Sequence, residues 1–314
     1  MKKPTIIGRP FILGINTGFA VNRYSEPEEW VRIVGEDLRL NTAQITADIL
    51  NPDLPSSYRL GQVTKINNAC AKYGVSISSA FTGAFTRVNH LAHPDKEVRR
   101  HWISWFKRFI DQSADLGAVA LGGHFGIFTL RENRDPVIRK IRLQQNIDGW
   151  HEIAKYAKDK GMKHILWEPM SISREQGDTI DTARLLQDQV NHNAPIPFKI
   201  CLDVDHGNLA STNPSDTDPS AWIRAFKTDT AQIHLKQSSL DKRSNGPFTN
   251  EFNKNGRIHA DEIIKTLISS GYSNTELLLE LSFREREPSD STVVEQLKQS
   301  IDYWRSHINS LEEP

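Results

Sequence analysis

The strongest constraint on the fold is a regular alternation of short apolar runs with longer amphipathic stretches along the 314-residue chain. Each apolar run is rich in Ile, Val, Leu, Ala or Phe and alternates only weakly with polar residues, which is typical of parallel strands buried on both faces. Eight strands are predicted, at residues 11–18, 42–49, 75–81, 118–124, 164–170, 199–205, 231–236 and 276–281. A predicted helix follows each strand, at residues 27–38, 56–72, 96–116, 136–160, 179–190, 219–226, 259–270 and 292–307.

Eight strand–helix units in series indicate an α/β fold with a parallel sheet. Eight is also the number that closes a (β/α)8 (TIM) barrel, a fold of roughly 250 residues plus insertions. The main alternative is an open, doubly wound sheet, but no Gly-x-Gly-x-x-Gly turn of a dinucleotide-binding fold follows the first strand. No linker or break in composition divides the chain, so we expect residues 1–314 to form one barrel domain.

The charge balance excludes several classes of partner. The chain has 39 Lys and Arg against 39 Asp and Glu, so its formal net charge is zero. This argues against a nucleic-acid partner bound through a large positive field and against a polybasic membrane anchor. The two cysteines, Cys70 and Cys201, form no disulfide framework and favour a cytoplasmic location.

Acidic and imidazole side chains stand at the ends of the last four predicted strands. They are Glu168, Asp203, His234 and Glu280. The chemistry of such a barrel lies at the carboxyl ends of its strands, where buried carboxylates must be paired, protonated or bound to a metal. Three carboxylates and one imidazole suit Mn²⁺, Mg²⁺ or Co²⁺. Any one of these residues could instead form an ordinary ion pair, and Asp205 could replace Asp203 because both lie on the same face of a strand.

Other residues near these strand ends are candidates for substrate binding. His206 follows Asp203 by three residues, and His124 ends the fourth strand, where a substrate contact and a packed core histidine are equally compatible with the sequence. The sequence places further cations near the predicted site, namely Lys236, Arg87, Arg284 and Arg286.

The order Glu, Asp-x-x-His, His, Glu on strands five to eight resembles the xylose-isomerase-like barrel superfamily, and within it the ketose 3-epimerases. Longer segments are similar to the D-erythrulose 1-phosphate 3-epimerase group of tetritol catabolism. These segments are Asn16-Thr17-Gly18-Phe19-Ala20-Val21, Glu26-Pro27-Glu28-Glu29-Trp30, Trp167-Glu168-Pro169-Met170-Ser171-Ile172, Cys201-Leu202-Asp203-Val204-Asp205-His206-Gly207, Gly246-Pro247-Phe248-Thr249 and Arg284-Glu285-Arg286-Glu287.

The resemblance implies a ketose or ketose-phosphate substrate and the interconversion of L- and D-erythrulose 1-phosphate in erythritol catabolism. It implies that Glu168, Asp203, His234 and Glu280 bind a divalent metal, with Mn²⁺ expected first. Glu168 and Glu280 would serve in turn as base and acid around an enediolate, a general acid–base role. Lys236 departs from many sugar epimerases, and free-sugar epimerases do not need Arg284 and Arg286, whose guanidinium groups suit a phosphate. Pairing of those arginines with Glu285 and Glu287 is the alternative.

Three other functions are alternatives to a ketose epimerase. An aldose–ketose isomerase would use the same metal site with a proton moved between C1 and C2. An endonuclease IV-like enzyme would need further histidine ligands that the second predicted strand does not offer. A non-catalytic sugar-binding barrel would need only one of the two glutamates. The sequence also leaves open whether the chain forms a homo-oligomer.

Overall fold

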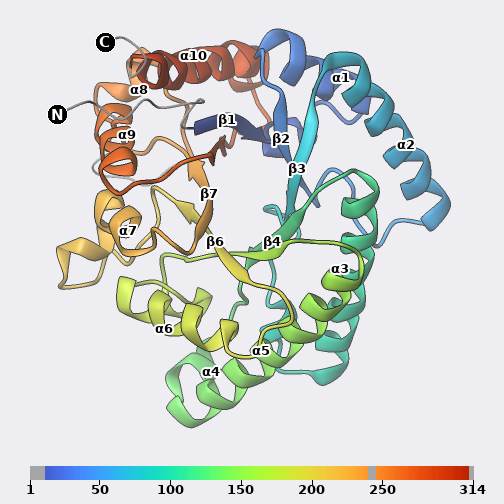
Figure 1. Cartoon of the computed structure of the whole chain (residues 1–314), viewed down its shortest axis with the longest axis vertical. Helices are drawn as coiled ribbons and strands as arrows, with labels where there is room; N and C mark the ends of the chain where they lie inside the picture. The colour runs from blue at the N-terminus through green and yellow to red at the C-terminus, as the bar shows by residue number, and fades with distance from the viewer. Residues whose placement is uncertain (1–10, 240–244, 311–314) are drawn as a thin grey trace.

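Eight parallel strands form a closed barrel in sequence order, which confirms the predicted (β/α)8 fold (Figure 1). The structure is a computed structural model and describes residues 11–239 and 245–310. The strands are β1 (Phe11–Asn16), β2 (Thr42–Thr46), β3 (Ser76–Phe81), β4 (Ala120–His124), β5 (His164–Glu168), β6 (Phe198–Asp203), β7 (Thr230–Leu235) and β8 (Thr275–Leu279).

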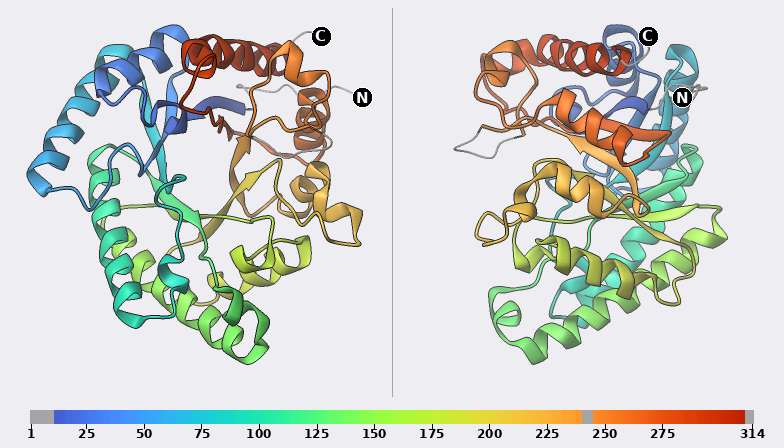
Figure 2. Two further views of the ribbon diagram at one scale, coloured as in Figure 1. Left: turned by 180° about the vertical axis from the view of Figure 1, so that it is seen from behind. Right: turned by 60° about the vertical axis from the view of Figure 1, so that its left-hand side comes forward.

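Helices surround the barrel on its outer side (Figure 2). They are α1 (Pro27–Arg32), α2 (Ser56–Tyr73), α3 (Lys96–Asp115), α4 (Leu130–Arg134), α5 (Pro136–Asp159), α6 (Ile180–Asn191), α7 (Pro219–Ala225), α8 (Asn250–Asn253), α9 (Ala260–Ser269) and α10 (Ser289–Asn309). The helix predicted at 27–38 is divided, because a π-helical turn (Ile33–Asp37) replaces its second half. Two short helices, α4 and α8, lie in connections that the periodicity left unassigned.

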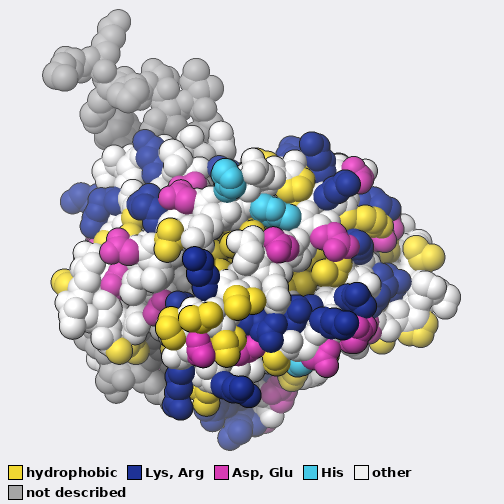
Figure 3. Space-filling model, turned by 90° about the horizontal axis from the view of Figure 1, so that it is seen from below, with side chains coloured by type: hydrophobic (Ala, Val, Ile, Leu, Met, Phe, Trp, Pro, Cys, Tyr) yellow, Lys and Arg dark blue, Asp and Glu magenta, His cyan; other side chains and the backbone are white. Residues whose placement is uncertain are grey.

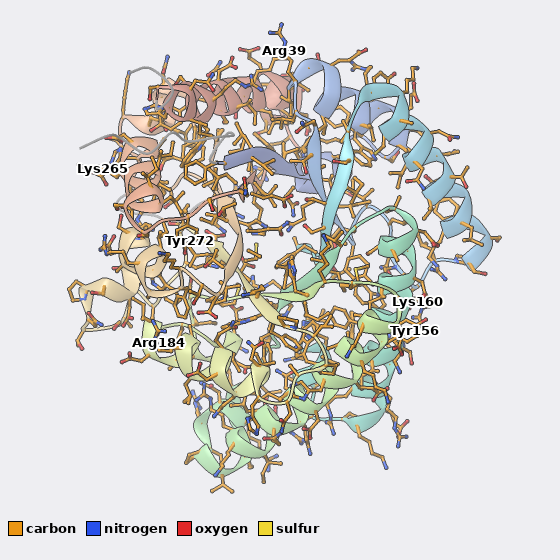
Figure 4. All side chains as sticks on the ribbon, in the orientation of Figure 1. Arg39, Tyr156, Lys160, Arg184, Lys265 and Tyr272 are labelled. Atoms are coloured by element: carbon orange, nitrogen blue, oxygen red, sulfur yellow. The ribbon has the colours of Figure 1, made fainter. Side chains whose placement is uncertain are left out.

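The main apolar core lies between the barrel and the helices. Trp105 and Phe106 on α3 and Trp150 on α5 are fully buried there. A second, smaller apolar cluster consists of Phe81, Ala120, Leu166 and Cys201, on four neighbouring strands. Leu166 and Cys201 share their strand faces with Glu168 and Asp203, two positions further on, so this cluster lines the barrel interior. Side chains fill the space within the ring of strands (Figure 4).

The register of the strands aligns the predicted site residues. His124 pairs with Glu168 across β4 and β5, and Asp203 pairs with His234 across β6 and β7. β4 and β5 approach each other very closely at Gly122, where a Cβ atom would lie 1.9 Å from the carbonyl oxygen of Leu166. Glycine is therefore required beside the strand end that carries Glu168.

The outer surface carries both signs of charge. On the face shown in Figure 3, acidic side chains lie beside many of the basic ones. Figure 4 labels Tyr156 on α5 and Lys160 directly after this helix, and the Lys160 ammonium lies 5.3 Å from the centre of the Tyr156 ring. Within the residues that the structure describes, we find no helix both long and apolar enough to cross a lipid bilayer.

Candidate metal centre and active site

Four acidic or imidazole side chains converge at the carboxyl end of the barrel. Glu168 and Asp203 are the last residues of β5 and β6, His234 lies in β7, and Glu280 directly follows β8. Each offers one donor atom, and these atoms all lie within 4.8 Å of one another. Glu168, Asp203 and His234 are buried and Glu280 is partly buried. We call these residues the four-donor group.

The four-donor group has the composition of a site for a hard or borderline divalent cation. It supplies carboxylate oxygens and one imidazole nitrogen, and it contains no cysteine. Three carboxylates brought this close together repel one another, so a nearby positive charge is required. Both a bound cation and a neighbouring basic side chain can provide that charge.

Lys236 is that basic neighbour. Its Nζ atom lies 2.5 Å from Oδ2 of Asp203 and 3.5 Å from Oε2 of Glu280. Burial on its own would lower the pKa of Lys236, but the carboxylates of Asp203 and Glu280 outweigh burial and raise it. The neighbouring carboxylates therefore favour the charged form of Lys236.

The pKa values of the two glutamates shift in opposite directions. Burial raises the pKa of Glu280, and the charges of Glu168 and Asp203 raise it further. Burial opposes ionisation of Glu168 as well, but His206 and His234 lower the pKa of that carboxyl below its usual value. For Asp203, His206 and Lys236 likewise overcome the effect of burial and lower the pKa.

Asp205 does not join the four-donor group. Its Oδ1 atom accepts a hydrogen bond from Oγ of Ser238 at 2.5 Å and forms an ion pair with Nη1 of Arg257 at 2.5 Å. Its backbone N–H donates to Oδ1 of Asp203 at 2.8 Å. Of the two aspartates, only Asp203 faces the other donors.

His206 lies at the edge of the four-donor group. Its Nδ1 atom donates to the carbonyl oxygen of Pro169 at 2.9 Å, and its Nε2 atom lies 3.3 Å from Nζ of Lys236. His206 and Lys236 line a cavity of about 140 Å³ together with Glu168 and Glu280. This cavity is the candidate substrate-binding site.

Two other predicted substrate-binding residues line the same cavity. The Nε2–H of His124 donates to the carbonyl oxygen of Val88 at 2.9 Å, and burial lowers the pKa of His124 to about 4. His124 is therefore a neutral side chain at physiological pH. Arg87 lines the cavity as well and forms an ion pair with Glu175.

The structure separates the two predicted arginines after β8. Arg284 lines a second cavity of about 290 Å³, which also contacts Glu280 and Asn245. Arg286 lines neither of the two cavities. Only Arg284 of the two therefore adjoins the site through a cavity, and the predicted role of both arginines in phosphate binding stays a prediction.

One buried side chain in contact with His234 is absent from the site residues predicted from the sequence. Oε1 of Gln44, on β2, lies 2.8 Å from Nε2 of His234. Gln44 is fully buried, and in β2 the polar residues Thr42, Gln44 and Thr46 alternate with apolar ones along a wholly buried strand. This alternation is the signal that could have identified Gln44, because buried polar groups need partners.

Comparison with known proteins places the chain in a family. Residues 43–307 match the family model for the xylose isomerase-like TIM barrel, so the chain belongs to this family. It is also 40% identical over 299 residues to the D-erythrulose 1-phosphate 3-epimerase of Brucella abortus (strain 2308), which covers 95% of this chain and 96% of that protein.

Solved structures share the fold. A proposed xylose isomerase from Rhodospirillum rubrum superimposes with a TM-score of 0.87 at 24% identity, over 94% of this chain and 99% of that one. D-psicose 3-epimerase from Clostridium cellulolyticum H10, solved with D-tagatose, gives 0.70 at 17% identity over 95% and 99% of the two chains. At these identities the structural likeness establishes the fold alone.

Proposed function

We propose that this chain is a divalent-metal-dependent ketose-phosphate 3-epimerase that interconverts D- and L-erythrulose 1-phosphate. The observation that carries the proposal is the four-donor group at the carboxyl end of the barrel, with a glutamate on β5 and another after β8. The 40% identity to a D-erythrulose 1-phosphate 3-epimerase supports the substrate, and we propose the role in tetritol catabolism from the resemblance of the sequence segments. The chain is thus an enzyme of the isomerase class.

Glu168, Asp203, His234 and Glu280 would hold the metal, and their oxygen and nitrogen donors fit Mn²⁺. When bound, the cation supplies a positive charge that stabilises the negative charge developing on the ketone oxygen. Mn²⁺ is the ion that we propose, and Co²⁺ and Mg²⁺ are the alternatives that metal reconstitution distinguishes.

Glu168 and Glu280 would move the proton at carbon 3. Epimerisation removes this proton from one face of the substrate and returns a proton to the other, so it needs two groups on opposite sides. The two glutamates come from strands β5 and β8 of the ring, and both line the 140 Å³ cavity. Their pKa values are shifted apart, Glu168 downward and Glu280 upward, which suits one group to accept a proton while the other donates one.

The remaining side chains would bind and orient the ketose. Lys236 is placed to donate hydrogen bonds to substrate oxygens beside the four-donor group. His206 contacts Lys236 through Nε2 and lines the same cavity, as do His124 and Arg87. Glu280 lines both cavities, so a chain of four carbons could place its reacting carbon near Glu280 and its phosphate in the wider cavity beside Arg284. Arg286 remains a predicted phosphate ligand without support from its position.

Formation of the epimer tests this proposal. The metal-free protein, reloaded with Mn²⁺, is incubated with D-erythrulose 1-phosphate, and the two enantiomers are separated after dephosphorylation by chiral chromatography. We expect the L-enantiomer to appear with Mn²⁺ and not with EDTA. Conversion of free erythrulose to an aldose would identify an isomerase instead, because the phosphate ester on carbon 1 prevents erythrulose 1-phosphate itself from becoming an aldose. Epimerisation of free erythrulose alone would contradict the phosphorylated substrate.

The domain organisation and the cellular location of the chain are proposed from the sequence. We propose that residues 1–314 form one domain, although residues 1–10, 240–244 and 311–314 lie outside the described ranges. We also propose a cytoplasmic location, which the two buried, unpaired cysteines Cys70 and Cys201 support.

A further inference from the structure

A cluster of polar side chains lies inside the barrel next to the four-donor group. It consists of Asn16 on β1, Gln44 on β2, Ser79 on β3 and Gln232 on β7, all 5% exposed or less. Buried amides are costly unless their donors and acceptors are matched, so the direction of each hydrogen bond in this cluster is constrained.

The direction of these hydrogen bonds is set by Glu276. Its carboxylate accepts hydrogen bonds from Oγ of Ser78 at 3.0 Å and from Nε2 of Gln232. An ionised carboxylate can only accept, so the amide nitrogen of Gln232 must face Glu276 and its Oε1 must face away. Gln232 therefore presents an acceptor to Gln44.

The same order of hydrogen-bond donors and acceptors continues through Gln44 to His234. Its Nε2 donates to Oε1 of Gln232 at 2.9 Å and to Oγ of Ser79 at 3.2 Å. Its Oε1 accepts from Nδ2 of Asn16 at 2.6 Å and lies 2.8 Å from Nε2 of His234. Because the Gln44 oxygen is already fixed as an acceptor, Nε2 of His234 must carry the proton in this contact.

We infer that Gln44 is a positioning residue that fixes the tautomer of His234 and so makes Nδ1 of His234 the metal-binding atom. Nδ1 lies 3.4 Å from Oε1 of Glu168 and 3.5 Å from Oε2 of Glu280, on the side of the other donors. The ring cannot easily turn over, because it is fully buried and packs edge-on against Phe81 with the ring centres 5.2 Å apart.

This inference rests on the proposed metal dependence, and its consequence is a contribution of Gln44 to metal affinity. Groups that orient a metal-binding histidine typically change metal affinity about 10–100-fold when they are removed. Gln44 lines neither of the two cavities at the barrel mouth, so it acts through His234 rather than through the substrate.

The test measures Mn²⁺ affinity by titration calorimetry in the wild-type protein and in two variants. Gln44→Leu removes the acceptor. Gln112→Leu is the matched control, because Gln112 is also a buried glutamine, and its Nε2 donates to the carbonyl oxygen of Leu50. We expect Gln44→Leu to bind Mn²⁺ about 10–100-fold more weakly, and Gln112→Leu to stay within about threefold of wild type.

The outcomes separate the inference from the proposed function. If the wild-type protein binds Mn²⁺ and Gln44→Leu binds it equally well, the inference is wrong and the proposed function stands. If Gln112→Leu weakens binding as much as Gln44→Leu does, the effect is a general loss of packing and the inference is also wrong. If the wild-type protein binds no divalent cation, both are wrong.

A second measurement needs no variant at Gln44. In protein labelled with ¹⁵N-histidine and saturated with Mg²⁺, two-bond proton–nitrogen correlations report which ring nitrogen carries hydrogen. The signals of His234 are identified by their loss in His234→Gln. We expect hydrogen on Nε2, and hydrogen on Nδ1 would overturn the inference.

Discussion

The Nζ atom of Lys236 lies 2.5 Å from Oδ2 of Asp203, so a lysine ammonium stands next to one of the four groups that we propose as metal ligands. The ammonium partly neutralises three neighbouring carboxylates and at the same time repels an incoming cation. Lys236 therefore has two opposing effects, one on the charge balance of the site and one on metal binding.

Replacing Lys236 by Met should separate these effects. We expect Lys236→Met to bind Mn²⁺ roughly tenfold more tightly, because a competing positive charge beside Asp203 is removed. At the same time kcat/KM should fall, because the donor next to His206 is lost. Calorimetry and steady-state kinetics measure the two quantities, and weaker Mn²⁺ binding in the variant would contradict the repulsion.

Glu168 and Glu280 should be needed for proton transfer as well as for metal binding. With Mn²⁺ at saturation, Glu168→Gln and Glu280→Gln should each lower kcat about 100-fold or more, since each removes one proton-transfer group. Glu152→Gln is a suitable control, because Glu152 is exposed and pairs only with Lys107 in the ion pairs of the described residues. A variant that keeps more than a tenth of the wild-type kcat with metal bound would remove that glutamate from the proton-transfer step.

Arg284 and Arg286 should differ in their effect on the substrate phosphate. Arg284 lines the cavity that adjoins Glu280, and Arg286 does not. We expect Arg284→Gln to raise KM for erythrulose 1-phosphate about tenfold or more, the cost of one charge-assisted hydrogen bond, with little change in kcat. Arg286→Gln should leave KM unchanged, and equal effects of the two substitutions would show that the cavity does not define the phosphate position.

The stability of the fold should fall in mild acid because of His164. This residue begins β5, and burial lowers its pKa to about 4, helped by the charges of Lys199 and Lys163. The unfolded chain binds the proton near pH 6.5, so stability is intact above that pH and is lost as the pH falls towards 4.

Replacement of His164 by Gln removes this titration. Between pH 7.5 and pH 5 the wild-type protein should lose about 1–2 kcal/mol more stability than His164→Gln does. Urea unfolding at the two pH values measures the difference. Parallel losses in the two proteins would show that His164 does not contribute to the pH dependence.

The sequence predicted the barrel and the four donors for one physical reason. Parallel strands buried on both faces are apolar, so a carboxylate such as Glu168 or Asp203 at the end of one is conspicuous, and closure of the barrel brings such ends together. Strand alternation could not decide whether Asp203 or Asp205 is the metal-binding aspartate. β6 ends at Asp203, so the alternation of side chains does not extend to Asp205. Asp205 instead contacts Arg257, which lies 52 residues further along the chain.

The parts that the sequence did not predict depend on contacts between distant segments. Gln44 is visible in the sequence only as a polar residue within a short strand, and its contact with His234, 190 positions away, depends on the fold. Arg284 and Arg286 are equivalent in the sequence, and only the path of the chain after β8 places Arg284 beside the cavity. Periodicity and spacing carry no information about either contact.

Proton exchange at carbon 3 is the most direct measure of epimerase chemistry in this protein. The Mn²⁺-loaded protein and an EDTA-treated sample are incubated in D₂O with D-erythrulose 1-phosphate, and the position of deuterium is read by NMR. We expect metal-dependent deuterium incorporation at carbon 3, which is lost in Glu168→Gln and Glu280→Gln. Incorporation at carbon 1 alone, or no incorporation in the Mn²⁺-loaded wild-type protein, would contradict this expectation.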